Sequence, residues 1–284
     1  MTDTPSTAPA TTPSPASAPA PSTAPAVPPA ARYGFIGTGE ITAALVTGLC
    51  TGTGTPPEIL LSPRNRDVAR GLAERFASVR VCADNQEVLD AVTVVVIAVL
   101  PPVAVDVLEE LSLRPDHVVV SAVAGLPLHR LAGPAAPART VVRSIPLPQA
   151  AHHGSLTVLY PDDADARALF SRVGEVVVPD DEDALEAFSA VTATFAAQLD
   201  QLSTIAGWLA GRGVAAGVAD AFVARIFAEM GRSLVDSGEP IAALAEAHTT
   251  PNGNNERFRA ELREAGVPGE VRRALDVILE RLRA

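Results

Sequence analysis

Short apolar runs alternate with amphipathic stretches between residues 32 and 180. The runs at 32–36, 58–61, 79–81, 92–99, 117–122, 141–143 and 156–160 predict strands, and the run at 92–99 is typical of a strand buried on both faces. Apolar residues at helical spacing predict helices at 40–49, 67–76, 85–91 and 103–111. Strands that alternate with helices predict an α/β fold with a doubly wound sheet.

The pattern changes after residue 180, where few strand signals remain. Long helices are predicted at 181–212 and 219–237, and shorter ones at 240–247, 255–265 and 270–284. We therefore predict an all-helical C-terminal domain over residues 181–284, after an α/β domain over residues 31–180. By analogy with other folds, a helical domain in this place supplies substrate contacts and a subunit interface.

The first thirty residues have no apolar periodicity. They consist almost wholly of Pro, Ala, Ser and Thr, and Asp3 is their only charged side chain. Such a segment buries too little surface to offset its ordering entropy, so residues 1–30 are predicted to be a disordered tail. A secretory signal is not expected, because a basic start and an apolar stretch are missing. We favour a spacer over a docking segment for a proline-recognising partner.

Charge and composition exclude several classes of function. The chain carries 33 acidic and 22 basic residues, a net charge of −11, and every basic residue is arginine. The missing lysines exclude a P-loop lysine and a Schiff-base lysine, and the acidic balance argues against nucleic-acid binding. Cys50 and Cys82 are too few for a disulfide scaffold or a cysteine zinc site, and no metal-ligand spacing is found. With no apolar run of ~18 residues, we expect a soluble cytoplasmic protein without membrane contacts.

A glycine turn follows the first predicted strand. Gly37 and Gly39 stand between the strand at 32–36 and the helix at 40–49, and Thr42 occupies the third position of the G-x-G-x-x-G/A pattern. Gly37 allows the tight turn, and Gly39 lets a pyrophosphate approach the backbone at the helix N-terminus. This strand–turn–helix order predicts a Rossmann-like dinucleotide-binding domain. The alternative is a plain tight turn.

The end of the second strand indicates which dinucleotide binds. An NAD site expects a carboxylate there, but the chain reads Leu-Ser-Pro-Arg-Asn from residue 61 and has no carboxylate before Asp67. Ser62 offers a hydroxyl group, and Arg64 offers a guanidinium group suited to a 2′-phosphate. The pattern favours NADP(H) over NAD. The alternative is that Ser62 only begins a turn and that Arg64 is solvated.

Five segments together resemble the pyrroline-5-carboxylate reductase family in order and spacing. They read RYGFIGTGEITAALVTGL, LLSPRN, ADNQEVLDAVTVVVIAVLP, VVSAVAGLPLHRL and VVRSIPLPQAAHHG, and the resemblance extends over about residues 32–284. It implies reduction of the C=N bond of a cyclic imino acid to proline with NADPH or NADH. It also implies a Rossmann domain followed by a helical domain that is swapped between subunits, in a homodimer or a larger homo-oligomer.

The resemblance assigns cofactor contacts by position. The residues implied are Gly37, Thr38, Gly39, Glu40 and Ile41 at the pyrophosphate, Ser62 and Arg64 at the 2′-phosphate, Asn85 at the adenosine ribose, and Ala98, Val99, Leu100, Pro101, Ala124 and Gly125 beside the nicotinamide. Some of these positions depart from the family pattern. Its usual Asn-Met is Glu40-Ile41 here, and its usual lysine is Leu100.

A loop before the helix at 255–265 is the candidate substrate site. The family's Ser-Pro-Gly-Gly-Thr-Thr segment reads Thr-Pro-Asn-Gly-Asn-Asn here, and its Gly-Ser-Gly-Pro-Ala segment is replaced near residues 194–198. Backbone N–H groups at a helix start favour an anion, and asparagine amides can donate where threonine hydroxyls would. Alternatively, one asparagine caps the helix and Asn252-Gly253 forms a turn. The residues proposed are Thr250, Asn254 and Asn255 as catalytic, and Thr249, Asn252 and Gly253 as substrate-binding.

These observations lead to one principal hypothesis and two alternatives. The principal hypothesis is NADP-dependent reduction of a cyclic imine, most simply 1-pyrroline-5-carboxylate, in proline biosynthesis. One alternative keeps the fold and cofactor but takes another cyclic imine or imino acid, because the substrate loop is altered. The other is a non-catalytic NADP-binding protein of the same fold.

Overall fold

The computed structural model describes residues 31–283, so the predicted tail at 1–30 lies outside the described residues. The strands are β1 (Arg32–Ile36), β2 (Glu58–Leu61), β3 (Val79–Val81), β4 (Val94–Ile97), β5 (Val118–Ser121), β6 (Thr140–Ile145), β7 (Ser155–Tyr160) and β8 (Gly174–Val177). The helices of the α/β part are α1 (Glu40–Thr51), α2 (Arg66–Arg75), α3 (Asn85–Asp90), α4 (Ala104–Glu109), α5 (Leu128–Ala132) and α6 (Ala164–Phe170), with 3₁₀ turns η1 (Pro101–Val103) and η2 (Pro148–His152). The later helices are α7 (Glu182–Thr192), α8 (Thr194–Ala210), α9 (Ala216–Asp236), α10 (Ile241–Ala247), α11 (Asn254–Glu264) and α12 (Val267–Arg283).

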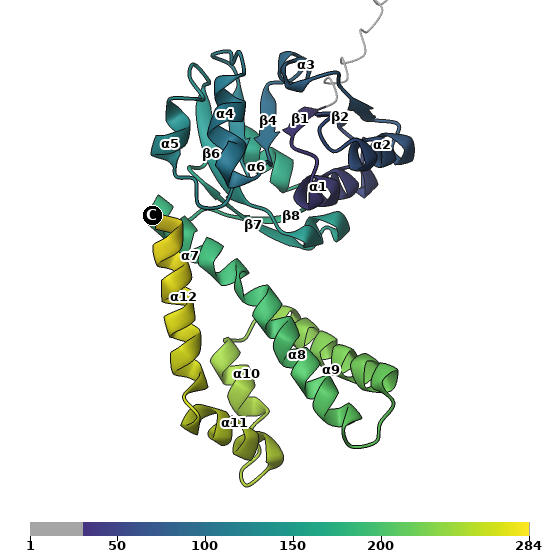
Figure 1. Cartoon of the computed structure of the whole chain (residues 1–284), viewed down its shortest axis with the longest axis vertical. Coiled ribbons are helices and arrows are strands. Elements are labelled where there is room, and N and C mark those ends of the chain that lie inside the picture. Colours follow the sequence, from purple (N-terminus) through teal and green to yellow (C-terminus); the bar gives the residue numbers. More distant parts are fainter. Residues whose placement is uncertain (1–30, 284) are drawn as a thin grey trace, which may run out of the picture.

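One eight-stranded sheet organises the first part of the chain. Its order is β3-β2-β1-β4-β5-β6-β7-β8. The strands are parallel except that β7 runs antiparallel to β6. The chain runs outward from β1 through β2 to β3 and then crosses back to β4 on the other side of β1, so the carboxyl ends of β1 and β4 meet beside the start of α1 (Figure 1). The predicted doubly wound Rossmann-like sheet with a helical C-terminal part is confirmed.

Helices cover both faces of this sheet, and each face has its own core. On one face, Phe35, Val96 and Val120 of the strands pack with residues of α1, α2 and α6, such as Leu45 and Phe170. The other core joins the opposite sides of the same strands to α3, α4 and α5. All four residues of β4 and of β5 are buried, because helices lie on both sides of them.

The structure divides the helix predicted at 181–212 into α7 and α8, which meet at Ala193. The threonines on either side explain the break. Thr192 donates its hydroxyl to the Ser189 carbonyl at 2.7 Å, and Thr194 donates to the Val191 carbonyl at 2.8 Å. Such bonds compete with the helix ladder and bend helices. The predicted boundary near residue 180 stays a prediction, and α7 itself packs against β7.

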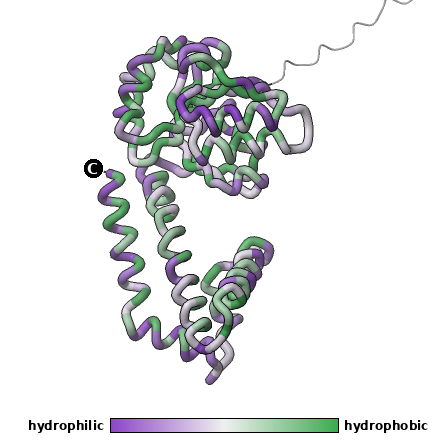
Figure 2. Tube along the Cα trace, turned by 45° about the vertical axis from the view of Figure 1, so that its right-hand side comes forward, coloured by the Kyte–Doolittle hydropathy of each residue, from purple (hydrophilic) through white to green (hydrophobic). Residues whose placement is uncertain are grey.

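Helices α8 to α12 project away from the sheet (Figure 1). Helix α12 returns to α7, where Arg283 pairs with Asp183 at 3.3 Å. Hydrophobic positions recur along the projecting helices, and many of them are exposed (Figure 2). Phe222, for example, is 57% exposed and Trp208 is 62% exposed. Among residues 31–283, no helix has both the length and the hydropathy that a membrane span requires.

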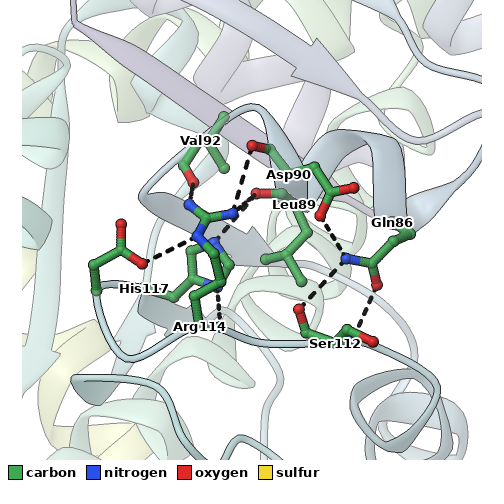
Figure 3. Close-up of polar contacts among 8 residues, drawn as sticks. Gln86, Leu89, Asp90, Val92, Ser112, Arg114 and His117 are labelled. Atoms are coloured by element: carbon green, nitrogen blue, oxygen red, sulfur yellow. Dashed lines mark hydrogen bonds and ion pairs between the residues drawn. The ribbon is translucent and has the colours of Figure 1, made fainter.

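A buried histidine directly before β5, His117, contacts the end of α3 (Figure 3). The Nδ1 atom of His117 accepts the backbone N–H of Arg114 at 2.9 Å, and Nε2 lies 3.2 Å from the Leu89 carbonyl. Both contacts are satisfied by a neutral ring that donates from Nε2. The Arg114 guanidinium also donates to the Val92 carbonyl at 2.9 Å. Burial and, secondarily, the Arg114 charge lower the pKa of His117.

We expect this histidine to make the fold sensitive to acid. Because its pKa is lowered in the folded state, the unfolded chain binds the proton more readily as the pH falls below about 6.5. The neutral His117 therefore contributes fully to the stability of the fold above that pH, and this contribution is lost as the pH falls below it. Urea unfolding between pH 7 and pH 5 should show a smaller loss of stability in His117→Gln than in the wild type. His129→Gln removes an exposed histidine as the control, and equal pH slopes in all three proteins would contradict the prediction.

Candidate functional site

Three side-chain hydrogen bonds hold the glycine turn between β1 and α1. The backbone N–H of Gly37 donates to the Ser62 hydroxyl at 2.9 Å, and the Thr42 hydroxyl donates to the Gly37 carbonyl at 2.6 Å. The backbone N–H of Asn65 donates to the Thr38 hydroxyl at 3.3 Å. Gly37 has a φ of 97°, a conformation that favours glycine. Thr42 is bulkier than the usual glycine or alanine of the pattern, and it fits because its hydroxyl hydrogen-bonds the turn at Gly37.

A pocket of about 700 Å³ opens above this turn, at the carboxyl ends of β1, β2 and β4. Gly39 is exposed there, and an added Cβ would meet no atom within 4 Å, so the backbone is open to a ligand. Arg64 and Arg66 lie at the β2 side, are exposed, and form no ion pair with any residue from 31 to 283. The predicted residues that the pocket brings together are Gly37, Thr38, Gly39, Glu40, Ile41, Arg64, Ala98, Val99 and Leu100.

The other predicted cofactor residues do not line this pocket. Ser62 is fully buried below the turn, where its oxygen accepts from Gly37. Asn85 is half-buried at the first position of α3, and Pro101 begins the 3₁₀ turn after Leu100. Gly125 has a φ of 66°, and a Cβ there would come within 3.3 Å of Leu282 on α12. Their roles toward a cofactor stay predictions.

A second pocket of about 730 Å³ adjoins the first, and Glu40, Ile41 and Ala122 line both. Its walls come from the ends of β5 and β6, from η2, and from the junction of α7 and α8. Most of the lining is apolar. The lining residues with the largest apolar side chains are Ile41, Ile145, Leu147, Leu185, Val191 and Phe195. Ala124, predicted to lie beside the nicotinamide, lines this second pocket.

A buried ion cluster forms part of the second pocket's wall. The Arg143 guanidinium on β6 is 3% exposed and lies 2.6 Å from Glu186 and 2.8 Å from Glu182, both on α7. Glu182 also accepts the backbone N–H of Leu128 at 2.7 Å. One cation thus faces two carboxylates four residues apart on one helix face, which fixes α7 against the sheet. Arg143 Nε and Glu186 Oε2 are buried without a hydrogen-bond partner.

The predicted substrate loop lies elsewhere in this chain. Thr249 to Gly253 connect α10 to α11, and Figure 1 shows these helices far from the sheet. The amide of Asn255 donates to the His248 carbonyl at 2.8 Å, and the Thr249 hydroxyl donates to the Ala245 carbonyl at 2.7 Å. Asn252 has a φ of 59°, as in a turn. None of Thr249, Thr250, Asn252, Gly253, Asn254 and Asn255 lines either of the two pockets at the sheet.

Sequence reasoning missed two groups of this site. Arg66 lines the first pocket beside Arg64, and its signal is the Arg-Asn-Arg spacing at the start of α2. Arg143 and its carboxylates were also missed. The only available signal was a charged residue ending an apolar strand, together with two glutamates at helical spacing. Among residues 31–283, His, Cys, Asp and Glu side chains nowhere form a group of three suited to a metal ion.

Comparison with known proteins agrees with this geometry. Residues 32–125 match the family profile described as NADP oxidoreductase, coenzyme F420-dependent. A pyrroline-5-carboxylate reductase of Corynebacterium melassecola is 27% identical over 262 residues, which cover 87% of this chain and 95% of that protein.

Two solved structures have the same fold. A pyrroline-5-carboxylate reductase of Coxiella burnetii superposes with a TM-score of 0.76 at 22% identity, covering 88% of this chain and 96% of the other. The Plasmodium falciparum pyrroline carboxylate reductase with NADP bound gives a TM-score of 0.73 at 15% identity, covering 89% and 97%. The chain therefore resembles the pyrroline-5-carboxylate reductase family over most of its length, in its sequence and in its fold.

Proposed function

We propose that this chain is an NAD(P)H-dependent oxidoreductase that acts on CH–NH bonds and reduces 1-pyrroline-5-carboxylate to proline, as a step of proline biosynthesis. The observation that carries the proposal is the pair of adjoining pockets at the carboxyl ends of the strands. They are a cleft at the glycine turn, where Rossmann-like folds bind dinucleotides, and a mostly apolar chamber next to it. The relatives named above match along nearly the whole chain, including the helical part.

NADP(H) is the cofactor that the first pocket favours. Its floor is the exposed backbone at Gly39 and the start of α1, where a pyrophosphate can approach. Arg64 and Arg66 are free to meet a 2′-phosphate at the β2 side, and NADP is bound in the Plasmodium neighbour. When bound, the reduced nicotinamide supplies the hydride. The protein's part is to place the imine carbon beside it and to exclude water.

The site is proposed to be completed by a second copy of the chain. Within one chain the Thr249–Asn255 segment lies away from both pockets. Large side chains such as Phe222, Ile226 and Met230 are 43–57% exposed on α9, an arrangement typical of an unpaired interface. A homodimer that exchanges its helical parts would cover this face and bring the partner's loop to the imino acid. We place the enzyme in the cytoplasm, consistent with its two free cysteines.

The direct test is NADPH oxidation in the presence of 1-pyrroline-5-carboxylate, with proline measured as the product. We expect turnover, with NADPH preferred to NADH. Turnover confined to another cyclic imine would shift the substrate class. Tight NADPH binding without oxidation across a panel of cyclic imines would indicate a non-catalytic protein.

Reversing the charge of Arg64 should weaken the binding of NADPH much more than the binding of NADH. In Arg64→Asp, a 2′-phosphate would lose a charge-assisted hydrogen bond and face a carboxylate, so the Kd for NADPH should rise at least about tenfold. The Kd for NADH, which lacks that phosphate, should change less than about twofold. Fluorescence titration of both dinucleotides gives the two constants. Arg130→Asp, an exposed reversal away from the pocket, is the matched control, and an unchanged NADPH preference in Arg64→Asp would contradict the assignment.

A further inference from the structure

Glu40 lies where the two pockets meet. It is the first residue of α1, it is exposed, and it lines both the pocket at the glycine turn and the apolar chamber. Its carboxylate forms no ion pair or side-chain hydrogen bond with any residue of the described chain. Glu40 stands in the first turn of α1, where a carboxylate favours the helix dipole, but no ion pair or side-chain hydrogen bond within the described chain holds it there.

The surrounding charges make Glu40 stand out further. Arg143 is the other charged residue that lines the chamber, and Glu182 and Glu186 already hold its guanidinium. Arg64 and Arg66 line the first pocket but not the chamber. The unpaired charge that the chamber offers is therefore negative. Such a chamber favours a ligand whose reacting part is a cation and whose body is apolar.

We propose that the Glu40 carboxylate is the counter-charge of the protonated imine nitrogen. The proposal rests on the proposed function, because a cyclic imine is reduced most readily as its iminium cation. A bound dihydronicotinamide would supply the hydride: its C–H bond would break as the new C–H bond forms at the imine carbon, the electron pair of the C=N π bond would become the nitrogen lone pair, and the positive charge would pass to the nicotinamide ring. The nitrogen keeps its proton, so the positive charge leaves it. Glu40 acts by favouring the protonated imine and gives up no proton in this step.

The same carboxylate should lower the affinity for the cofactor. A pyrophosphate at the start of α1 would lie near Glu40, and two anions close together repel each other. Removing the charge should therefore weaken the binding of the protonated imine and strengthen the binding of the dinucleotide. If Glu40 only supported the fold, its replacement would weaken the binding of both ligands.

Glu40→Gln tests the proposal in the full-length protein. We expect kcat/KM for 1-pyrroline-5-carboxylate to fall about tenfold, equivalent to about 1.4 kcal/mol, while the Kd for NADPH, measured by fluorescence without imine, falls about twofold. The basic limb of the pH dependence of kcat should move to lower pH, because the bound imine holds its proton less tightly. Glu40→Asp keeps the charge and should recover part of the loss. Glu110→Gln, an exposed carboxylate that lines neither pocket, should change neither constant.

A second substrate identifies which part of the imino acid Glu40 meets. The carboxylate-free ring 1-pyrroline should lose the same factor in Glu40→Gln, since the contact is to the nitrogen. A gain on 1-pyrroline-5-carboxylate alone would mean that Glu40 only repels the substrate carboxylate, and it would overturn the proposal. So would an unchanged kcat/KM in a variant of an active enzyme. A wild-type protein that turns over neither imine would instead refute the proposed function itself.

Discussion

Replacing Arg143 by methionine should lower the free energy of unfolding by about 3–5 kcal/mol, because it leaves buried carboxylate without its cation. The Glu186 side chain is 5% exposed, and its Oε2 atom already has no hydrogen-bond partner. With Arg143 removed, Oε1 would also lose the guanidinium that lies 2.6 Å away. Glu182 is more exposed and can turn to water.

A double variant distinguishes charge from packing. In Arg143→Met/Glu186→Gln the buried group is neutral, so at least about half of the lost stability should return. Arg70→Met breaks an exposed pair with Asp67 and should cost less than about 1 kcal/mol. Urea unfolding at one protein concentration measures all three. A loss below about 1 kcal/mol in Arg143→Met, or a double variant no more stable than the single, would refute this account of the cluster.

This cluster also affects the chamber. Val191, Thr192 and Phe195 of the chamber wall follow Glu186 along α7 and into α8. Their position depends on how α7 lies against β6. We therefore expect surviving folded Arg143→Met protein to bind an imine less well, whereas its binding of NADPH at the first pocket should change little.

Most of the α/β part could be predicted because its signals are local. The strand predicted within 92–99 contains β4, whose four residues are all apolar because helices lie on both of its faces, and the turn at Gly37 is visible as two glycines between a strand and a helix. Elements without such a signal were missed. Edge strand β8 reads GEVV and is only partly buried, so neither alternation nor a continuous apolar run identifies it. The break at Ala193 depends on two threonine hydroxyls, which helical periodicity does not register.

The candidate site shows the same division. Much of the cofactor half, from Gly37 to Arg66, is encoded within one βαβ unit, so Arg64 could be proposed from its place after β2. The chamber is assembled from segments up to about 150 residues apart, from Glu40 to Phe195, and no sequence spacing connects them. Ser62 illustrates a further limit. Its position at the strand end was recognised, but its fully buried hydroxyl serves the turn through Gly37.

Substituting alanine for Gly37 should destabilise the protein by about 3 kcal/mol or more and abolish dinucleotide binding. The residue has a φ of 97°, and holding a side chain in such a conformation costs about 1–3 kcal/mol. An added Cβ would also come within 2.3 Å of the Ala98 carbonyl oxygen, which belongs to the backbone after β4 and cannot move freely. Since Ala98 lines the cofactor pocket, relief of this overlap would deform the pocket floor.

Gly39→Ala is the matched control, because it adds the same methyl group two residues away without either penalty. Gly39 has a φ of −89°, and its added Cβ would meet no atom within 4 Å. Its urea midpoint should therefore stay close to that of the wild type, while the methyl group obstructs the approach of a pyrophosphate and raises the Kd for NADPH. The pair separates the two glycines by role, one needed for the turn and the other for the ligand. Equal losses of stability in both variants would contradict this separation, and unchanged NADPH binding in Gly39→Ala would place the pyrophosphate away from the start of α1.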